Sequence, residues 1–233
     1  MPVLTLKNVK KEYYVGEITI PAVEDVSFEL NEGEFVVILG ASGAGKTTLL
    51  NLLGGMDRAT SGEIVIYGKN ITKFNKKELA NYRRNDVGFV FQFYNLMPNL
   101  TALENVEIAF EICDNHLDPK IVLEEVGLAN RLNNFPAELS GGEQQRVSIA
   151  RAIAKNPKLI LCDEPTGALD YVTGKKILQL LQDLSRKDNK LIIVVTHNAA
   201  LKAMADKVIK IKSGKVESIE VNENPVPVEV IEW

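Results

Sequence analysis

The chain has 233 residues, of which 45% are hydrophobic and 25% are charged, and it carries a formal net charge of −4. This composition is typical of a globular protein, and the length is enough to bury one large core or a core with an inserted lobe. The acidic balance argues against nucleic acid as a partner, because no global basic field would attract it.

Local features exclude further classes. The basic stretch Lys76–Arg84 also contains Glu78, which indicates a solvated helix face rather than a nucleic-acid groove. The apolar runs are far shorter than the ~20 residues that a membrane-spanning helix needs, and the N-terminus lacks the apolar segment of a secretory signal. Cys113 and Cys162 have no metal-ligand spacing, and we expect Cys162 to be a small buried hydrophobe. We therefore expect a cytoplasmic chain, with any membrane span supplied by another chain.

Two kinds of strand are predicted. Looser apolar alternation predicts antiparallel strands of a flanking sheet at Val3–Val9, Val23–Leu30 and Glu63–Tyr67. Continuous apolar runs predict strands buried on both faces of a parallel sheet, at Phe35–Leu39, Leu159–Cys162 and Leu191–Val195. A helical pattern follows each continuous run, at Lys46–Leu53, Gly174–Leu184 and Ala199–Met204. The predicted fold class is therefore α/β, with a mostly parallel sheet.

The middle of the chain is predicted to be helical, with helix-like stretches at Leu103–Ile112, Pro119–Val126 and Glu143–Ala154 and no convincing strand. We expect a single domain over residues 1–233. Residues 1–92 and 157–216 would form the α/β core with its antiparallel sheet, and residues 93–156 an inserted helical subdomain. Residues 217–233 would be a C-terminal tail, either an exposed strand or a frayed end.

The first continuous run is followed by GASGAGKT, which matches the phosphate-loop pattern G-x-x-x-x-G-K-[ST] without a mismatch. Glycines let the backbone approach phosphate oxygens, and the following helix points its positive end at the same anion. Lys46 adds a cation for the β- and γ-phosphates, and the Thr47 hydroxyl is placed to bind Mg²⁺. A glycine-rich turn without chemistry would not explain the full motif between a strand and a helix. The predicted ATP-binding residues of this loop are Gly40, Ala41, Ser42, Gly43, Ala44, Gly45, Lys46, Thr47 and Thr48.

Polar side chains follow the other two continuous runs, at the sheet edge where ligands of α/β proteins bind. Asp163 suits Mg²⁺ because hard cations prefer oxygen, and Glu164 can polarise a water for in-line attack on the γ-phosphate. His197 could hold that phosphate and the water in register. Taken singly, an Asp-Glu pair is often a helix cap and a histidine is often structural. Their convergence on the phosphate loop favours catalytic roles for Glu164, His197 and Lys46.

A second glycine motif begins the helix-like stretch near residue 143. Ser140 and Glu143 can form a capping box, which is a structural reason for both residues. The box does not explain the consecutive glycines Gly141 and Gly142, which expose amides at a positive helix end and so predict a second anion site. A two-fold dimer, in which each Ser140–Gly142 segment closes over the nucleotide of the other chain, would use both sites.

The sequence LSGGEQQR is similar to the signature motif of ATP-binding cassette (ABC) proteins, and almost the whole chain can be laid on that family's pattern. The resemblance implies a P-loop NTPase core, ATP and Mg²⁺ as ligands, and a head-to-tail homodimer that forms on ATP binding and hydrolyses ATP at two composite sites. It implies that Tyr13 stacks on adenine, that Gln92 touches Mg²⁺ and senses the membrane partner, and that His197 is the switch histidine. The residues implied at the ATP site of the other protomer are Ser140, Gly141, Gly142 and Glu143. Those implied at the dimer interface are Ala168, Leu169 and Asp170.

Within the family, FQFYNLMPNLTALENV and DEPTGALD most resemble the subgroup of lipoprotein-release and macrolide-export ATPases. That resemblance implies an integral membrane partner with few transmembrane helices, and a place at the cytoplasmic face of the membrane through that partner. Ala44, Thr47 and Thr48 are conservative departures, and the helical lobe around Ile112–Ile121 is short. Two alternatives are a soluble ABC-type ATPase, such as an iron–sulfur assembly subunit, and a P-loop kinase or GTPase. The second alternative predicts no role for Ser140–Gly142.

Overall fold

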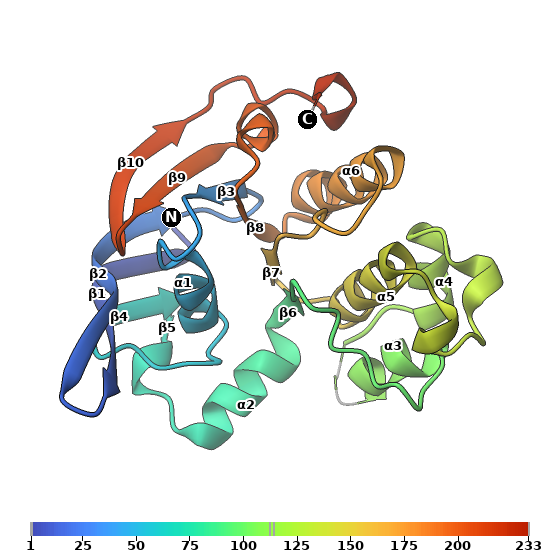
Figure 1. Cartoon of the computed structure of the whole chain (residues 1–233), viewed down its shortest axis with the longest axis horizontal. Coiled ribbons are helices and arrows are strands. Elements are labelled where there is room, and N and C mark those ends of the chain that lie inside the picture. The colour runs from blue at the N-terminus through green and yellow to red at the C-terminus, as the bar shows by residue number, and fades with distance from the viewer. Residues whose placement is uncertain (1, 112, 114, 233) are drawn as a thin grey trace.

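A computed structural model describes residues 2–111, 113 and 115–232 of the chain (Figure 1). Two sheets and a group of helices set to one side of them make up the fold. Ile112, at the end of one predicted helix and the start of the lobe segment that is short for the family, lies outside the described residues.

The central sheet has six strands in the order β10-β9-β3-β8-β7-β6. The strands from β9 to β6 are parallel, and β10 pairs antiparallel with β9 at the edge. Successive residues of β3 belong alternately to apolar clusters on opposite faces of the sheet. The predicted parallel sheet, buried on both faces, is confirmed. Its strands are β3 (Phe35–Leu39), β6 (Val87–Val90), β7 (Leu159–Asp163), β8 (Leu191–Thr196), β9 (Lys207–Lys212) and β10 (Lys215–Val221).

The second sheet is antiparallel, in the order β2-β1-β4-β5, and confirms the predicted flanking sheet. Its first two strands are longer than predicted and form the hairpin that projects at the lower left of Figure 1. Within that hairpin Tyr13 pairs with Ile20. The strands are β1 (Leu4–Val15), β2 (Ile18–Leu30), β4 (Ser61–Ile66) and β5 (Lys69–Asn70).

Six α-helices occur in the described residues. They are α1 (Lys46–Leu53), α2 (Lys76–Asn85), α3 (Ala102–Glu111), α4 (Pro119–Glu125), α5 (Gly141–Ala154) and α6 (Tyr171–Asp188). The helices α3, α4 and α5 pack on one another beside the sheets, and the part of residues 95–156 that the structure describes contains no strand. In α2 only Leu79 and Tyr82 are buried, as expected for a solvated basic helix.

Short 3₁₀ helices connect these elements, at η1 (Ile71–Lys73), η2 (Ala129–Arg131), η3 (Pro136–Glu138), η4 (Ala199–Met204) and η5 (Val228–Val230). The predicted helix after the third buried run is therefore wrong in type, since η4 is a 3₁₀ helix. The predicted helix at 174–184 is the middle of the longer α6. Asp170 caps α6 and Asn189 ends it in a left-handed conformation, so the bounds follow from polar caps rather than from apolar spacing.

The sequence prediction omits the strands β5, β6 and β9, and it gives an exposed strand only as one of two possibilities for the segment that contains most of β10. β6 has only four residues and includes Gly88, where a Cβ atom would lie 2.7 Å from the carbonyl oxygen of Ala152 in α5. Close packing on α5 therefore excludes a side chain that would have marked the strand. β10 is a charged edge strand, mostly exposed, and such strands carry a weak apolar pattern.

The C-terminal tail, predicted as residues 217–233, begins in an exposed strand and continues as a segment that packs on the core. Residues 217–221 belong to the exposed strand β10, which was one of the two expectations. The residues after it pack against α6, where Val228 is 2% and Ile231 is 4% exposed. Hydrogen bonds fasten this segment, including one from Tyr171 Oη to the Ile231 carbonyl at 3.2 Å.

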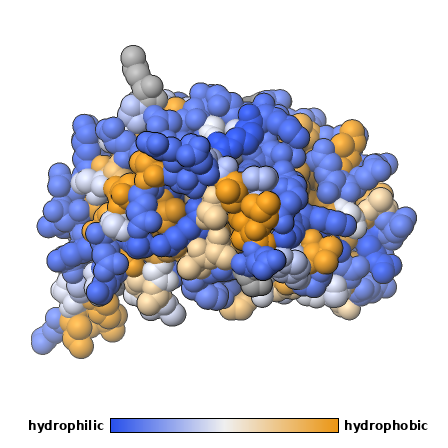
Figure 2. Space-filling model, turned by 90° about the horizontal axis from the view of Figure 1, so that it is seen from above, coloured by the Kyte–Doolittle hydropathy of each residue, from blue (hydrophilic) through white to orange (hydrophobic). Residues whose placement is uncertain are grey.

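The outer surface is mostly hydrophilic on the face shown in Figure 2, where apolar side chains gather in separate small groups. None of the helices in the described ranges has the length and apolar character needed to cross a membrane. Cys162 is completely buried in β7, as expected of a small hydrophobe, and burial raises the pKa of its thiol far above the ordinary range.

Candidate nucleotide-binding site

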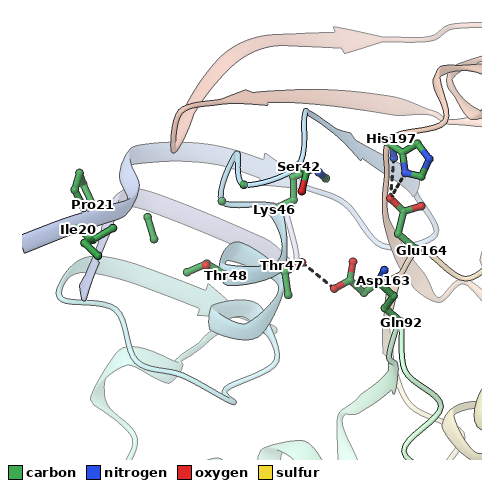
Figure 3. Close-up of a pocket in the computed structure, with 13 residues that line it drawn as sticks. Ile20, Pro21, Ser42, Lys46, Thr47, Thr48, Gln92, Asp163, Glu164 and His197 are labelled. Carbon is green, nitrogen blue, oxygen red and sulfur yellow. Dashed lines mark hydrogen bonds and ion pairs between the residues drawn. The ribbon is translucent and has the colours of Figure 1, made fainter. Parts of the chain in front are cut away.

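A cleft of about 710 Å³ lies where the loop before α1 meets the carboxyl ends of β7 and β8 (Figure 3). The predicted positions that line it come from four separate stretches of the chain. They are Ser42, Gly43, Gly45, Lys46, Thr47, Thr48, Gln92, Asp163, Glu164 and His197. The expected convergence of the phosphate loop with the strand-end residues is therefore present.

The phosphate loop has the backbone that its glycines allow. Gly45 ends the loop with φ = 98°, and a Cβ atom there would lie 2.2 Å from the Ala22 carbonyl oxygen. A Cβ atom on Gly40 would lie 2.3 Å from the Ile211 carbonyl oxygen. A side chain at either position would thus collide with backbone, and the positive φ adds strain at Gly45. The helix α1 then directs its free amide groups towards the cleft.

Lys46 is the cation of the site. Its side chain is 8% exposed, and its Nζ donates hydrogen bonds to the carbonyl oxygens of Gly40 at 2.8 Å and Ala41 at 2.9 Å. These bonds hold the ammonium against its own loop, beside the amides at the start of α1. A phosphate in the cleft would meet a charge that is already positioned.

Thr47 and Asp163 bring two side-chain oxygen atoms together at the cleft wall. The Thr47 hydroxyl donates to Asp163 Oδ2 at 2.9 Å, and Asp163 is only 7% exposed. Burial and the neighbouring Glu164 raise the pKa of Asp163, while the Thr47 hydrogen bond and Lys46 oppose that rise. A hydroxyl and a carboxylate in contact at a phosphate loop are the hard oxygen ligands that Mg²⁺ uses together with substrate phosphates, so these residues fit that ion.

Glu164 is held by the end of the neighbouring strand. Its Oε2 accepts a hydrogen bond from the Thr196 hydroxyl at 2.9 Å, and its Oε1 accepts one from the His197 amide at 2.9 Å. His197 Nδ1 lies 2.7 Å from the same Oε1. Glu164 also has φ = 48°, an uncommon conformation for a residue with a side chain. Strain and three contacts at a cleft wall are typical of a functional position.

Some predicted residues lie outside the cleft wall. Gly40 and Ala41 contact the site through Lys46, and the side chain of Ala44 is buried in the core. Tyr13 does not line the cleft, although its strand partner Ile20 does. The predicted ATP contacts of Tyr13 and these loop residues stay predictions.

Sequence reasoning missed two groups of residues. Ile20, Pro21 and Ala22 of β2 form one wall of the cleft, and Thr196 orients Glu164. Thr196 directly follows an apolar run that was recognised, so its position at the strand end was an available signal. The wall formed by β2 has no local signal, because it depends on how the two sheets pack.

Ser140 begins α5 as the predicted capping box. Its Oγ accepts from the Glu143 amide at 3.3 Å, and Glu143 Oε2 accepts from the Ser140 amide at 2.8 Å. The Ser140 amide, Arg131 at 2.9 Å and the Ser140 hydroxyl together lower the pKa of Glu143 to about 2. The capping interpretation is therefore correct, whatever else this helix start does.

The two glycines of this motif have different surroundings. A Cβ atom on Gly141 would lie 2.8 Å from Tyr94 Oη, so packing within the chain is one reason for that glycine. A Cβ atom on Gly142 would lie 3.5 Å from the Ala168 carbonyl oxygen, which is ordinary contact. Gly142 therefore faces the segment Ala168–Asp170 that was predicted at the dimer interface. Neither Ser140–Gly142 nor Ala168–Asp170 lines the cleft of its own chain.

A phosphate loop at the end of a buried parallel strand, with two carboxylates at the end of β7 and a histidine after β8, defines a P-loop nucleotide-binding protein. Residues 23–167 match the family described as ABC transporter. The chain belongs to the ABC transporter family, as one of its ATP-binding ATPase domains, and such domains bind ATP with Mg²⁺ as the usual ion. The family resemblance and the P-loop NTPase fold predicted from the sequence are thus confirmed.

Similar proteins extend this assignment. An uncharacterized ABC transporter ATP-binding protein of Thermotoga maritima is 46% identical over 94% of this chain and 95% of its own length. The macrolide export ATP-binding/permease protein MacB of Psychrobacter cryohalolentis is 41% identical over 96% of this chain, which spans 34% of that protein. Two other curated relatives are also longer than this chain, which spans 44% and 50% of their lengths.

A solved structure has the same fold. The ATP-binding cassette MJ0796 was solved as a dimer in a post-hydrolysis state, bound to ADP and Pi. The curated protein MJ0796 is from Methanocaldococcus jannaschii. It matches with a TM-score of 0.89 and 43% identity, over 94% of this chain and 98% of that one.

Proposed function

We propose that this chain hydrolyses ATP at two composite sites of a head-to-tail homodimer and thereby drives a separate membrane subunit of an exporter. The observation that carries the hydrolytic part is the Glu164 carboxylate, held at the cleft wall by Thr196 and His197. The dimeric state of a cassette with the same fold supports the assembly. The similarity to a macrolide export protein supports an export role.

The residues divide the chemistry among themselves. The amides of the phosphate loop and the Lys46 ammonium would bind the β- and γ-phosphates. Thr47, Asp163 and Gln92 would hold Mg²⁺, which neutralises charge that develops on the phosphates. Glu164 would accept a proton from the attacking water, and the contact with His197 would keep its carboxylate aimed at that water.

The second half of each site would come from the other protomer. Ser140, Gly141, Gly142 and Glu143 begin a helix whose positive end does not face the cleft of its own chain. In a head-to-tail dimer this helix start would bind the γ-phosphate held by the partner chain. The segment Ala168–Asp170, in contact with Gly142, would then lie at the interface.

A substitution at Ser140 tests the composite site. In Ser140→Arg, titration calorimetry should still detect ATP binding to the single chain, whereas phosphate release should be abolished. The matched control is Asn75→Arg, because Asn75 caps α2 through the same kind of capping box and lines neither the cleft nor the groove beside α3 and α5. Full hydrolysis by Ser140→Arg would overturn the composite site, and equal loss in Asn75→Arg would trace the effect to helix stability.

An apolar groove supports the membrane partner. A cavity of about 330 Å³ lies between the α/β core and the helices α3 and α5, directly beside the chain that leads to Gln92. Its walls include the stacked rings of Phe89 and Phe91, 4.2 Å apart, and the exposed side chains Met56 and Ile108. We propose that a cytoplasmic segment of a membrane subunit with few transmembrane helices docks there, so that the chain works at the cytoplasmic face of the membrane.

Co-purification tests that docking. Ile108→Asp should remove the membrane subunit from the purified complex and leave ATP hydrolysis by the isolated chain unchanged. Ile219→Asp is the matched control, because Ile219 is similarly exposed on the edge strand β10. Recovery of the wild-type chain with soluble scaffold proteins alone would instead support the iron–sulfur assembly alternative.

A further inference from the structure

Outside the cleft, one cluster of charged and aromatic side chains ties the β1–β2 hairpin to the end of α1. Its centre is Asp57, in the loop that follows α1. The Lys11 ammonium donates to Asp57 Oδ1 at 2.7 Å, and the Tyr13 hydroxyl donates to Asp57 Oδ2 at 2.9 Å. Each carboxylate oxygen thus holds one residue of β1.

The side chains of this cluster are shielded from solvent and joined by several hydrogen bonds. The Lys11 side chain is only 13% exposed and that of Asp57 30%, so this ion pair is better shielded than a surface pair. Lys11 also donates to the Arg58 carbonyl at 3.0 Å, and the Arg58 amide donates to Asp57 at 2.7 Å. Burial raises the pKa of Asp57, but these donors together with Tyr13 outweigh it and hold the pKa below its ordinary value.

The ring of Tyr13 is immobilised from two sides. Its hydroxyl is bound to Asp57, and the Lys11 ammonium lies over one ring face, 4.8 Å from the centroid. Tyr13 nevertheless remains 38% exposed, so part of its aromatic surface can still contact another planar group. Burial and the Asp57 bond raise the pKa of the Tyr13 hydroxyl while the Thr48 side chain lowers it, so the ring lies beside the phosphate-loop helix.

The same loop is tied to β1 by its backbone. The Thr60 amide donates to the Lys10 carbonyl at 2.8 Å, and the Thr60 hydroxyl accepts from the Glu12 amide at 3.0 Å. The loop begins where α1 ends, and α1 begins at Lys46 in the phosphate loop. The ring of Tyr13 is therefore held at a set distance from the phosphate site.

We propose that Asp57 and Lys11 are positioning residues for the adenine base: they fix the Tyr13 ring so that one face is ready to stack on the base of the ATP held by Gly40–Thr47. This rests on the proposed ATP binding and on the stacking role that the family resemblance implies for Tyr13, and not on the dimer or the membrane partner. Neither residue lines the cleft, so their effect on the nucleotide would pass through the Tyr13 ring. Fixing a ring before binding avoids the entropy of ordering it later, which is worth about three- to ten-fold in affinity.

The test separates base from phosphate binding. Titration calorimetry on the purified chain should show about a three- to ten-fold weaker Kd for ATP in Asp57→Ala and in Lys11→Met, with inorganic triphosphate binding unchanged. In steady-state hydrolysis the same variants should raise KM and leave kcat unaltered, because a base contact is equal in the ground and transition states. Lys10→Met, an exposed lysine of the same strand, should change none of these values.

Double variants distinguish positioning from a merely structural role. Once Tyr13→Ala has removed the ring, Asp57→Ala should cost no further ATP affinity. Additive losses, or equal weakening of ATP and triphosphate, would overturn the proposal. If Asp57→Ala does not fold, Tyr13→Phe removes only the hydroxyl that Asp57 holds, and unchanged ATP affinity there would also overturn it. A wild-type chain that binds ATP no better than triphosphate would refute base stacking itself, whereas hydrolysis and partner docking have separate readouts.

Discussion

Replacing Glu164 by glutamine tests the hydrolytic mechanism most directly. Gln keeps one oxygen to accept the Thr196 or His197 bonds and nearly the same volume, so the geometry at the end of β7 should survive. The carboxylate that would accept the proton of the attacking water is lost. A positioned general base contributes about 10²–10⁴ in rate, which corresponds to about 2.7–5.4 kcal/mol of activation free energy.

The assay is phosphate release from ATP by the purified chain, with nucleotide binding measured in parallel. Turnover should fall by about two to four orders of magnitude while ATP affinity is retained, and the unhydrolysed ATP should stabilise a dimer detectable by light scattering. Glu32→Gln is the matched control, because Glu32 lies in an exposed turn and is distant from Glu164 in the sequence. This variant should hydrolyse ATP at the wild-type rate. Turnover of Glu164→Gln within about two-fold of wild type would refute the role of this carboxylate.

Three further predictions concern stability. The pKa of Glu143 is lowered from 4.5 to about 2, so its stabilising effect is present above pH 4.5 and is lost as the pH falls towards 2. Glu143→Gln should therefore make the free energy of unfolding, measured with urea, less dependent on pH between pH 5 and 3, whereas parallel pH curves for the variant and the wild type would contradict this. Gln145 is 1% exposed, and neither of its amide atoms has a hydrogen-bond partner among the described residues. Gln145→Met should therefore raise the free energy of unfolding, measured by urea denaturation, by about 1–3 kcal/mol, whereas a loss of stability would indicate that a bound water satisfies the amide. Ile231→Ala should lower the free energy of unfolding by about 2–5 kcal/mol if the tail packs as described, whereas the exposed Val230→Ala should cost little in the same denaturation series.

The parts that could be predicted from sequence are those with local or topological rules. A phosphate loop has a fixed spacing, and continuous apolar runs indicate parallel strands whose carboxyl ends meet. Together these rules predict that Lys46, Asp163, Glu164 and His197 lie at one cleft, as they do in the structure. The capping box at Ser140 is equally local and was recovered in full.

The parts that could not be predicted depend on register and long-range packing. Asp163 pairs with Val195, which places Glu164 level with Thr196 and allows their hydrogen bond. No pattern within either strand fixes that register. The contact of Tyr13 with Asp57 joins residues 44 positions apart, and the need for glycine at 141 comes from Tyr94 across the helical segment.

The charge of Glu143 at the start of α5 bears on whether this helix start can bind a phosphate in a composite site. A carboxylate at the start of α5 offsets the positive end of the helix, and Glu143 would repel a γ-phosphate that approached Ser140. Arg131 is bound to that carboxylate at 2.9 Å, and its side chain is 50% exposed, so the local charge is an ion pair rather than a bare anion. The capping box uses the Glu143 amide but not the amides of Gly141 and Gly142, which remain available to a phosphate on the partner chain. The capping and anion-binding interpretations of this motif are therefore compatible, because Arg131 compensates the charge that the cap introduces.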